Sequence, residues 1–189
     1  MLRLIWKLYW RLGGWKIAGS FPYQYKKMVL IIAPHTHWQD LFVGFAARHQ
    51  LKITHAKFLG KKELFVGPLG WLLRRLGGTP VDRFSKQGMV EQAAALFATN
   101  ENFLLAMAPE GTRKRVDKLR SGFYHIAKQA QVPILPIGFD FENKQVIIGE
   151  TIFTSADEAA DMKKIIAFFS VIKGKKPDRD LRHLNEINK

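Results

Sequence analysis

The sequence predicts an α/β domain in which helices flank a central mixed, mostly parallel sheet. Short apolar runs, typical of buried strands, alternate with helical segments along most of the chain. The 189 residues are enough for one sizeable core, and 47% of them are apolar, which argues against extended disorder. No internal repeat or Pro/Ser-rich linker divides the sequence, so we expect a single domain.

Residues 2–12 predict an amphipathic helix. At 100° per residue, Arg3, Lys7 and Arg11 share one stripe, and apolar side chains cover most of the remaining surface. Three tryptophans suited to a water–lipid boundary lie in or just after it: Trp6, Trp10 and Trp15. No acidic residue precedes Asp40. We therefore expect residues 1–27 to form an arm on an anionic membrane surface, with packing on the protein's own core as the alternative.

The remaining elements are expected in an alternating order. Thr36-x-x-Gln39 and Ser155-x-x-Glu158 have the pattern of capping boxes that open two helices. Expected strands are 28–33, 53–59, 103–108, 133–141 and 145–148; expected helices are 36–48, 69–76, 87–98, 121–130 and 155–172. We expect residues 28–172 to form the main domain and 173–189 a basic C-terminal tail.

Charge and composition limit the function. The formal net charge is +14, which attracts nucleic acid, anionic lipid or phosphorylated substrates. There are no cysteines, which excludes thiolate catalysis and disulfides. No apolar run is long enough to span a bilayer, and the start lacks the features of a signal peptide. We expect a peripheral or monotopic protein on the cytoplasmic face of a membrane.

The first candidate site is the segment from Pro34 to Asp40. If Thr36 caps the following helix, His35 lies on the strand-to-helix turn and Asp40 lies in the first helical turn. The turn could then bring the carboxylate to one imidazole nitrogen, leaving the other to take a proton from an alcohol. The alternatives are pairing of His37 with Asp40, a metal site built on His35, His37 and Asp40, and a capped helix with surface histidines.

Two further segments carry candidate anion-binding residues. Ala108–Arg113 follows an apolar strand, at the edge where α/β sheets place their ligands. Its glycine allows close approach of an anion, and Arg113 offers a planar fork matched to phosphate. Gly77–Arg83 ends in a second candidate fork, Arg83. Taken singly, each segment is equally compatible with a solvated turn.

Four segments in this order resemble the glycerophospholipid acyltransferase family, which includes lysophosphatidic acid acyltransferases. The family has four sequence blocks. The first is His-x4-Asp and the second is Gly followed six places later by Arg. The third is Phe-Pro-Glu-Gly-Thr-Arg and the fourth is Val-Pro-Ile-x-Pro. The likeness covers residues 28–140 and is closest to a compact bacterial branch. The matching positions here are His35–Asp40, Gly77–Arg83, Ala108–Arg113 and Val132–Pro136. The departures from the family pattern are Pro34, His37, Pro80 and Ala108.

The resemblance implies an enzyme that moves a fatty acyl group from a thioester to the hydroxyl of a lysophospholipid. His35 would be the general base and Asp40 its orienting partner, with no metal and no cofactor. The donor would be acyl-coenzyme A or acyl carrier protein. Residues implied in acceptor binding are Lys62, Arg83, Glu110, Gly111, Thr112 and Arg113. The rival functions are a basic nucleic-acid-binding module and a metal-dependent hydrolase using His35, His37 and Asp40.

Overall fold

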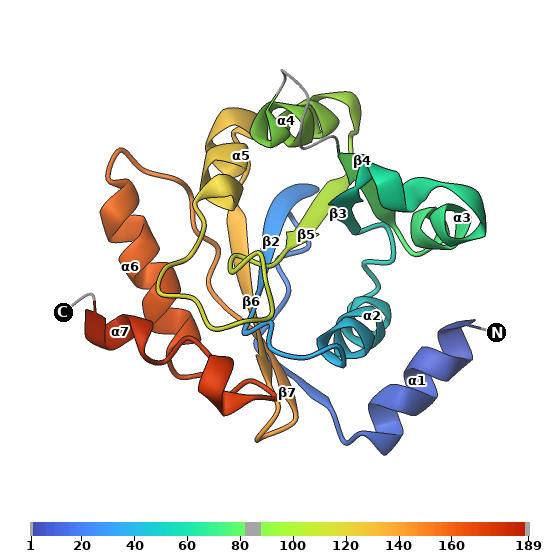
Figure 1. Ribbon diagram of the computed structural model, residues 1–189, viewed down its shortest axis with the longest axis horizontal. Helices are drawn as coiled ribbons and strands as arrows, with labels where there is room; N and C mark the ends of the chain where they lie inside the picture. The colour runs from blue at the N-terminus through green and yellow to red at the C-terminus, as the bar shows by residue number, and fades with distance from the viewer. Residues whose placement is uncertain (1, 82–87, 188–189) are drawn as a thin grey trace.

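The computed structural model describes residues 2–81 and 88–187, and it forms an α/β domain with one seven-stranded sheet (Figure 1). The strand order is β1-β7-β6-β2-β5-β3-β4. All neighbouring strands pair in parallel except β6 and β7, so the mixed, mostly parallel sheet expected from the sequence is confirmed. The strands are β1 (Lys16–Ala18), β2 (Lys27–Ala33), β3 (Lys57–Lys61), β4 (Gly78–Val81), β5 (Phe103–Met107), β6 (Ile134–Asp140) and β7 (Gln145–Ile148).

Helices cover both faces of the sheet (Figure 1). They are α1 (Leu2–Leu12), α2 (Asp40–Gln50), α3 (Gly67–Arg75), α4 (Met89–Thr99), α5 (Gly122–Ala130), α6 (Glu158–Phe169) and α7 (Leu184–Ile187), with short 3₁₀ turns η1 (Lys62–Phe65) and η2 (Pro177–Arg179).

The central strand β2 shows how the two halves of the core form. Side chains alternate between the faces of a strand, so Val29 and Ile31 join the cluster under α4, α5 and α6. Met28 and Leu30 join the opposite cluster, with residues of α1 and α2. Because both faces are covered, the strand is a continuous apolar run, as expected for a buried parallel strand.

The structure corrects two expected helix starts and adds two strands. Helix α2 begins at Asp40 after Gln39, not at Thr36; Thr36 is buried and its hydroxyl accepts a hydrogen bond from the backbone of Lys176. Helix α6 is capped by Asp157, whose side chain accepts from the Ala160 amide. The short strands β1 and β4 were not expected.

The N-terminal segment is part of the folded domain. Strand β1 pairs with β7, and Trp6, Trp10 and Trp15 are buried in the core cluster that includes α2 residues. The tryptophans therefore pack on the protein itself, which was the alternative to lipid contact. Four other apolar residues of α1 remain exposed: Leu4, Ile5, Leu8 and Leu12.

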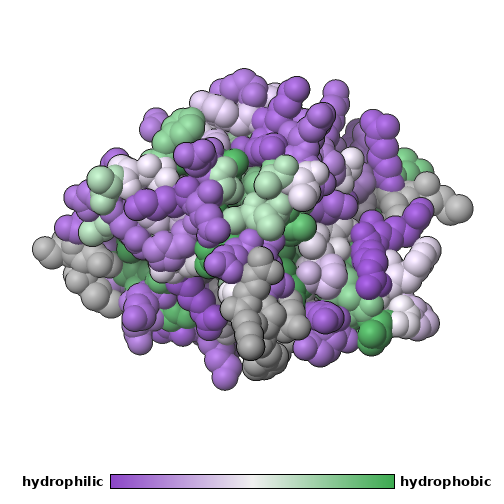
Figure 2. Space-filling view, turned by 90° about the horizontal axis from the view of Figure 1, so that it is seen from above, coloured by the Kyte–Doolittle hydropathy of each residue, from purple (hydrophilic) through white to green (hydrophobic). Residues whose placement is uncertain are grey.

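The C-terminal segment also packs on the domain. Leu181 and Leu184 are buried in the cluster under α4, α5 and α6. The face of the molecule in Figure 2 is mostly hydrophilic, with hydrophobic residues in small groups. In the part of the chain that the structure describes, no helix is both long and apolar enough to cross a membrane.

Candidate active site

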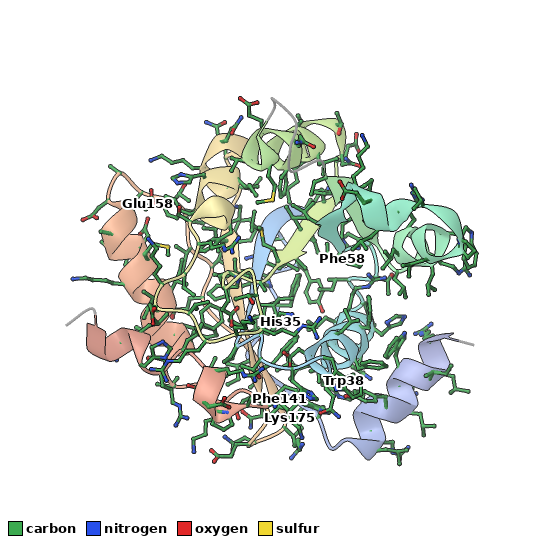
Figure 3. The ribbon with its side chains drawn as sticks, viewed as in Figure 1. His35, Trp38, Phe58, Phe141, Glu158 and Lys175 are labelled. Carbon is green, nitrogen blue, oxygen red and sulfur yellow. The ribbon has the colours of Figure 1, made fainter. Side chains whose placement is uncertain are left out.

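The site is built where two parallel strands end at the same edge of the sheet. Strand β2 ends at Ala33 and leads into the turn that carries His35; β5 ends at Met107 and leads into the loop that carries Glu110. The two strands are neighbours, with Ile31 opposite Met107. Because carboxyl ends of parallel strands meet at one edge, the first and third sequence blocks come together there. His35 lies near the centre of the molecule in Figure 3.

His35 and Asp40 form a direct pair. Nδ1 of His35 lies 3.1 Å from Oδ2 of Asp40, whose side chain is only 1% exposed. Asp40 is the first residue of α2, where the helix dipole favours a negative charge. No described group hydrogen-bonds to Nε2 of His35, and the His35 side chain is 30% exposed. The pair can therefore present Nε2 to an incoming hydroxyl.

His37 has a different role from the one considered as an alternative. Its backbone N–H, not its ring, donates to Oδ2 of Asp40 at 2.8 Å. Its ring Nδ1 lies 3.4 Å from the amide nitrogen of Gln39. Among the residues that the structure describes, no group of three or more His, Asp or Glu side chains is placed to hold a metal ion, and this includes the set His35, His37 and Asp40.

Glu110 lies beneath the His35 turn instead of at the surface. Only 2% of the residue is exposed, and Oε1 accepts a 2.6 Å hydrogen bond from the His35 backbone N–H. Burial raises the pKa of this carboxyl to about 7, opposed by its backbone hydrogen bonds and by His35. The resemblance implies contact of Glu110 with the acceptor; in the structure its carboxyl supports the backbone that carries His35.

Gly111 has a left-handed backbone conformation that favours glycine. Its φ is +64°, and a Cβ atom there would lie 2.8 Å from Nε of Arg120. This backbone turns the loop so that Thr112 and Arg113 line a cleft of about 380 Å³ next to His37 and Trp38. Figure 3 shows Trp38 on the α2 side of His35.

The other residues implied in binding are placed as follows. Lys62 is an exposed residue at the start of η1, directly after β3, so it is at the same edge of the sheet as His35. Arg83 lies outside the described residues. Val132 is buried, and Pro136 lies in β6 opposite Ile31 of β2. Lys176 and Arg179 belong to no sequence motif, and they complete the lining of the cleft.

A family model described as Acyltransferase matches residues 16–140. The chain belongs to the acyltransferase family. The fold of this acyltransferase is similar to that of the crystal structure of the 1-acyl-sn-glycerophosphate (LPA) acyltransferase PlsC from Thermotoga maritima. The TM-score is 0.54 at 17% identity, and the match covers 88% of this chain and 74% of that chain. No curated protein matches the sequence significantly.

The matched region of the acyltransferase includes the His35 turn and the Glu110 loop, which meet at one sheet edge. It ends at Asp140, so the segment that brings Lys176 and Arg179 to the cleft lies beyond it.

Proposed function

We propose that this acyltransferase moves a fatty acyl group from a thioester to the hydroxyl of a lysophospholipid-like acceptor. The observation that carries the proposal is the buried Asp40 carboxylate 3.1 Å from Nδ1 of a partly exposed His35, beside a basic cleft. A base with an orienting carboxylate is what activation of an alcohol needs. The family match supports acyl transfer as the reaction class.

In the proposed reaction the acceptor hydroxyl gives its proton to Nε2 of His35. Its oxygen forms a bond to the thioester carbonyl carbon, and the carbon–sulfur bond then breaks. The leaving thiolate takes the proton from the imidazolium. Asp40 holds the ring orientation and stabilises the imidazolium charge. Glu110 is a positioning residue because it holds the backbone of His35. No metal or cofactor is needed for these steps.

The cleft supplies the charge for the acceptor. Arg113 would hold a phosphate through its planar fork, and Gly111 and Thr112 would shape the loop around it. Lys62, at the same edge of the sheet as His35, would add positive charge, as would Arg83 of the second sequence block. The donor is proposed to be acyl-coenzyme A or acyl carrier protein, both of which offer the acyl group as a thioester.

We further propose that the enzyme works on the surface of an anionic membrane. Leu4, Ile5, Leu8 and Leu12 are exposed on α1 and share an arc of about 100°, with the basic stripe of Arg3, Lys7 and Arg11 alongside. Helix α3 adds exposed Leu69, Trp71 and Leu72, with Arg74 and Arg75 in its last turn. Exposed apolar side chains beside basic ones suit an anionic lipid surface.

Aromatic contacts run from the domain-facing side of α1 to the site. Trp6 and Tyr9 of α1 pack on Phe42 of α2, with ring centroids 6.1 and 6.3 Å apart. Phe42 contacts Trp38, which contacts His37. Phe42 and Trp38 are 39% and 55% exposed, so they provide apolar surface between α1 and the His35 turn, where an acyl chain would pack.

The test is acyl transfer by purified wild-type, His35→Ala and His37→Ala enzymes. Each would be given acyl-coenzyme A or acyl carrier protein as donor and a panel of lysophospholipids as acceptors. We expect His35→Ala to lose roughly 10²–10⁴-fold in rate, the range for removal of a general base, whereas His37→Ala keeps most activity. If only His37→Ala lost activity, His37 would be the general base and the assignment of His35 would be wrong. Wild-type inactivity with every pair would reject the proposed substrates.

A further inference from the structure

The C-terminal segment returns to the active-site turn from beyond the family match. The backbone N–H of Lys176 donates to Oγ1 of Thr36 at 3.1 Å. Gly174 packs so closely on this turn that an added Cβ would lie 2.9 Å from Cγ2 of Thr36. This segment is therefore in direct contact with the residue that follows His35.

The C-terminal segment also contacts the loop that follows the third block and the core. Nε2 of His183 is 2.8 Å from the backbone oxygen of Val116, in the connection that follows Arg113. Leu181 and Leu184 are buried, and Asp180 accepts a 2.8 Å hydrogen bond from Nε of Arg182. These contacts fix the position of η2, so the side chains of Lys176 and Arg179 are presented from a supported backbone.

Four cations from two distant parts of the chain line one cleft. Arg113 and Lys114 come from the third block, and Lys176 and Arg179 come from the C-terminal segment. The described lining residues include no acidic side chain. Arg179 has one acidic neighbour, Asp178, at 3.5 Å, but Asp178 is 71% exposed, and such surface pairs contribute little.

The charge of the cleft favours a bound phosphate group. Like charges gathered in one concavity repel each other, and an anion bound among them removes that repulsion. Arginine and lysine donate charge-assisted hydrogen bonds to phosphate oxygens, and Thr112 provides a hydroxyl group in the same lining. The volume of about 380 Å³ is large enough for a phosphate ester.

We propose that Lys176 and Arg179 complete, with Arg113 and Lys114, a binding site for a phosphate group carried by one of the two substrates. The inference rests on the proposed function, and it adds residues outside the matched region to the substrate site. The phosphate belongs either to the acceptor headgroup or to the phosphopantetheine arm of the donor. Both sources share the chemistry that the cleft recognises.

The test compares Lys176→Ala/Arg179→Ala with Lys163→Ala/Lys175→Ala, a control that removes the same charge from exposed positions. Lys175 is next in sequence but lies over the ring of Phe141, with Nζ 5.8 Å from the centroid (Figure 3), and does not line the cleft. Binding of glycerol 3-phosphate and of coenzyme A would be measured by calorimetry on the full chain, with thermal unfolding to confirm that each variant is folded.

We expect the cleft variant to lose roughly tenfold or more in affinity for one of the two probes, and the control to change less than about twofold. Loss for glycerol 3-phosphate assigns the site to the acceptor, and loss for coenzyme A assigns it to the donor. In turnover, the KM of the same substrate should rise while kcat is kept. If the cleft variant bound both probes as tightly as the wild type, or if the wild type bound neither probe, the proposed phosphate site would be wrong.

These outcomes separate the site from the proposed function. Probe binding that depends on Lys176 and Arg179 in a wild type without transfer activity would keep the site and reject the function. Normal transfer with KM values that do not respond to the cleft variant would keep the function and reject the site.

Discussion

At the scale of single residues, Glu110 is the least favourably placed charge near the site. Its Oε1 is bonded to the His35 amide, but Oε2 is buried and has no hydrogen-bond partner among the described residues. Burial raises its pKa from 4.5 to about 7 because the ionised form is poorly solvated there. Ionised Glu110 therefore costs folding stability in exchange for holding the turn that carries His35.

Replacing Glu110 with glutamine should change how stability depends on pH. Between pH 4.5 and about 7 the folded wild type binds more protons at Glu110 than the unfolded chain does. The contribution of Glu110 to the free energy of unfolding therefore falls as pH rises through that window and is constant above it. Glu110→Gln lacks this effect. We expect its stability relative to wild type to rise by up to about 3 kcal/mol from pH 4 to pH 8.

Urea unfolding of both proteins across that range measures this difference, in which the contributions of the other titrating groups cancel. Parallel stability curves for wild type and Glu110→Gln would contradict the buried, proton-binding state of Glu110.

Asp40→Asn tests the orienting role of the carboxylate. The amide oxygen can still accept the His37 backbone hydrogen bond made at 2.8 Å, so the turn should keep its shape. The amide carries no charge, so it cannot stabilise the imidazolium of His35. We expect kcat/KM to fall roughly 10²–10⁴-fold with a thermal midpoint close to wild type. A variant that is folded and nearly fully active would remove Asp40 from the mechanism.

At the scale of secondary-structure elements, the sequence predicted β2, β5 and β6 well because each is an almost continuous apolar run. The strand expected at 53–59 instead begins at Lys57, because β3 has only a short apolar stretch. Strands β1 and β4 were missed since they have three and four residues, too few for a pattern, and pairing with β7 and β3 defines them. The start of α2 was misjudged because the Thr36 hydroxyl is used by Lys176, 140 residues away. Local pattern cannot reveal such a contact.

The same limit applies to the candidate site. The turn geometry of His35 and Asp40 was accessible from the sequence because both residues lie within one strand-to-helix connection. The buried position of Glu110 and the arrival of Lys176 and Arg179 depend on how β2, β5 and the C-terminal segment meet. Residues brought together by tertiary packing leave no spacing pattern.

Two helical glycines provide a matched test of packing between elements. A Cβ on Gly70 in α3 would lie 2.2 Å from the backbone carbon of Phe65, and backbone cannot move aside cheaply. A Cβ on Gly44 in α2 would lie 3.5 Å from Cζ of Phe139, an ordinary contact. We expect Gly70→Ala to destabilise by about 1–3 kcal/mol and Gly44→Ala to stabilise by up to about 1 kcal/mol.

Chemical denaturation of the two alanine variants measures whether each change lowers or raises the free energy of unfolding. If Gly70→Ala were as stable as Gly44→Ala, the close packing of α3 on η1 would be wrong.

At the scale of the whole molecule, α1 presents different faces to the protein and to its surroundings. Trp6 and Trp10 are buried against the domain, so substitutions on the opposite face should leave the fold intact. Leu4 and Leu8 are 72% and 55% exposed and lie next to the basic stripe. If this face enters an anionic lipid surface, its apolar area contributes to binding together with the charge.

Leu4→Glu/Leu8→Glu should therefore weaken binding to vesicles that contain phosphatidylglycerol by roughly tenfold or more. The matched control is Phe153→Glu/Val171→Glu, which adds the same charge at apolar positions with 59% and 76% exposure. These positions lie before and after α6, a helix that packs on the face of the sheet opposite to α1. Vesicle sedimentation, repeated with pure phosphatidylcholine and at high salt, separates the apolar contribution from the electrostatic one. Equal losses in the two variants would mean that net charge alone drives association, and stronger loss in the control would move the membrane surface to the opposite side of the domain.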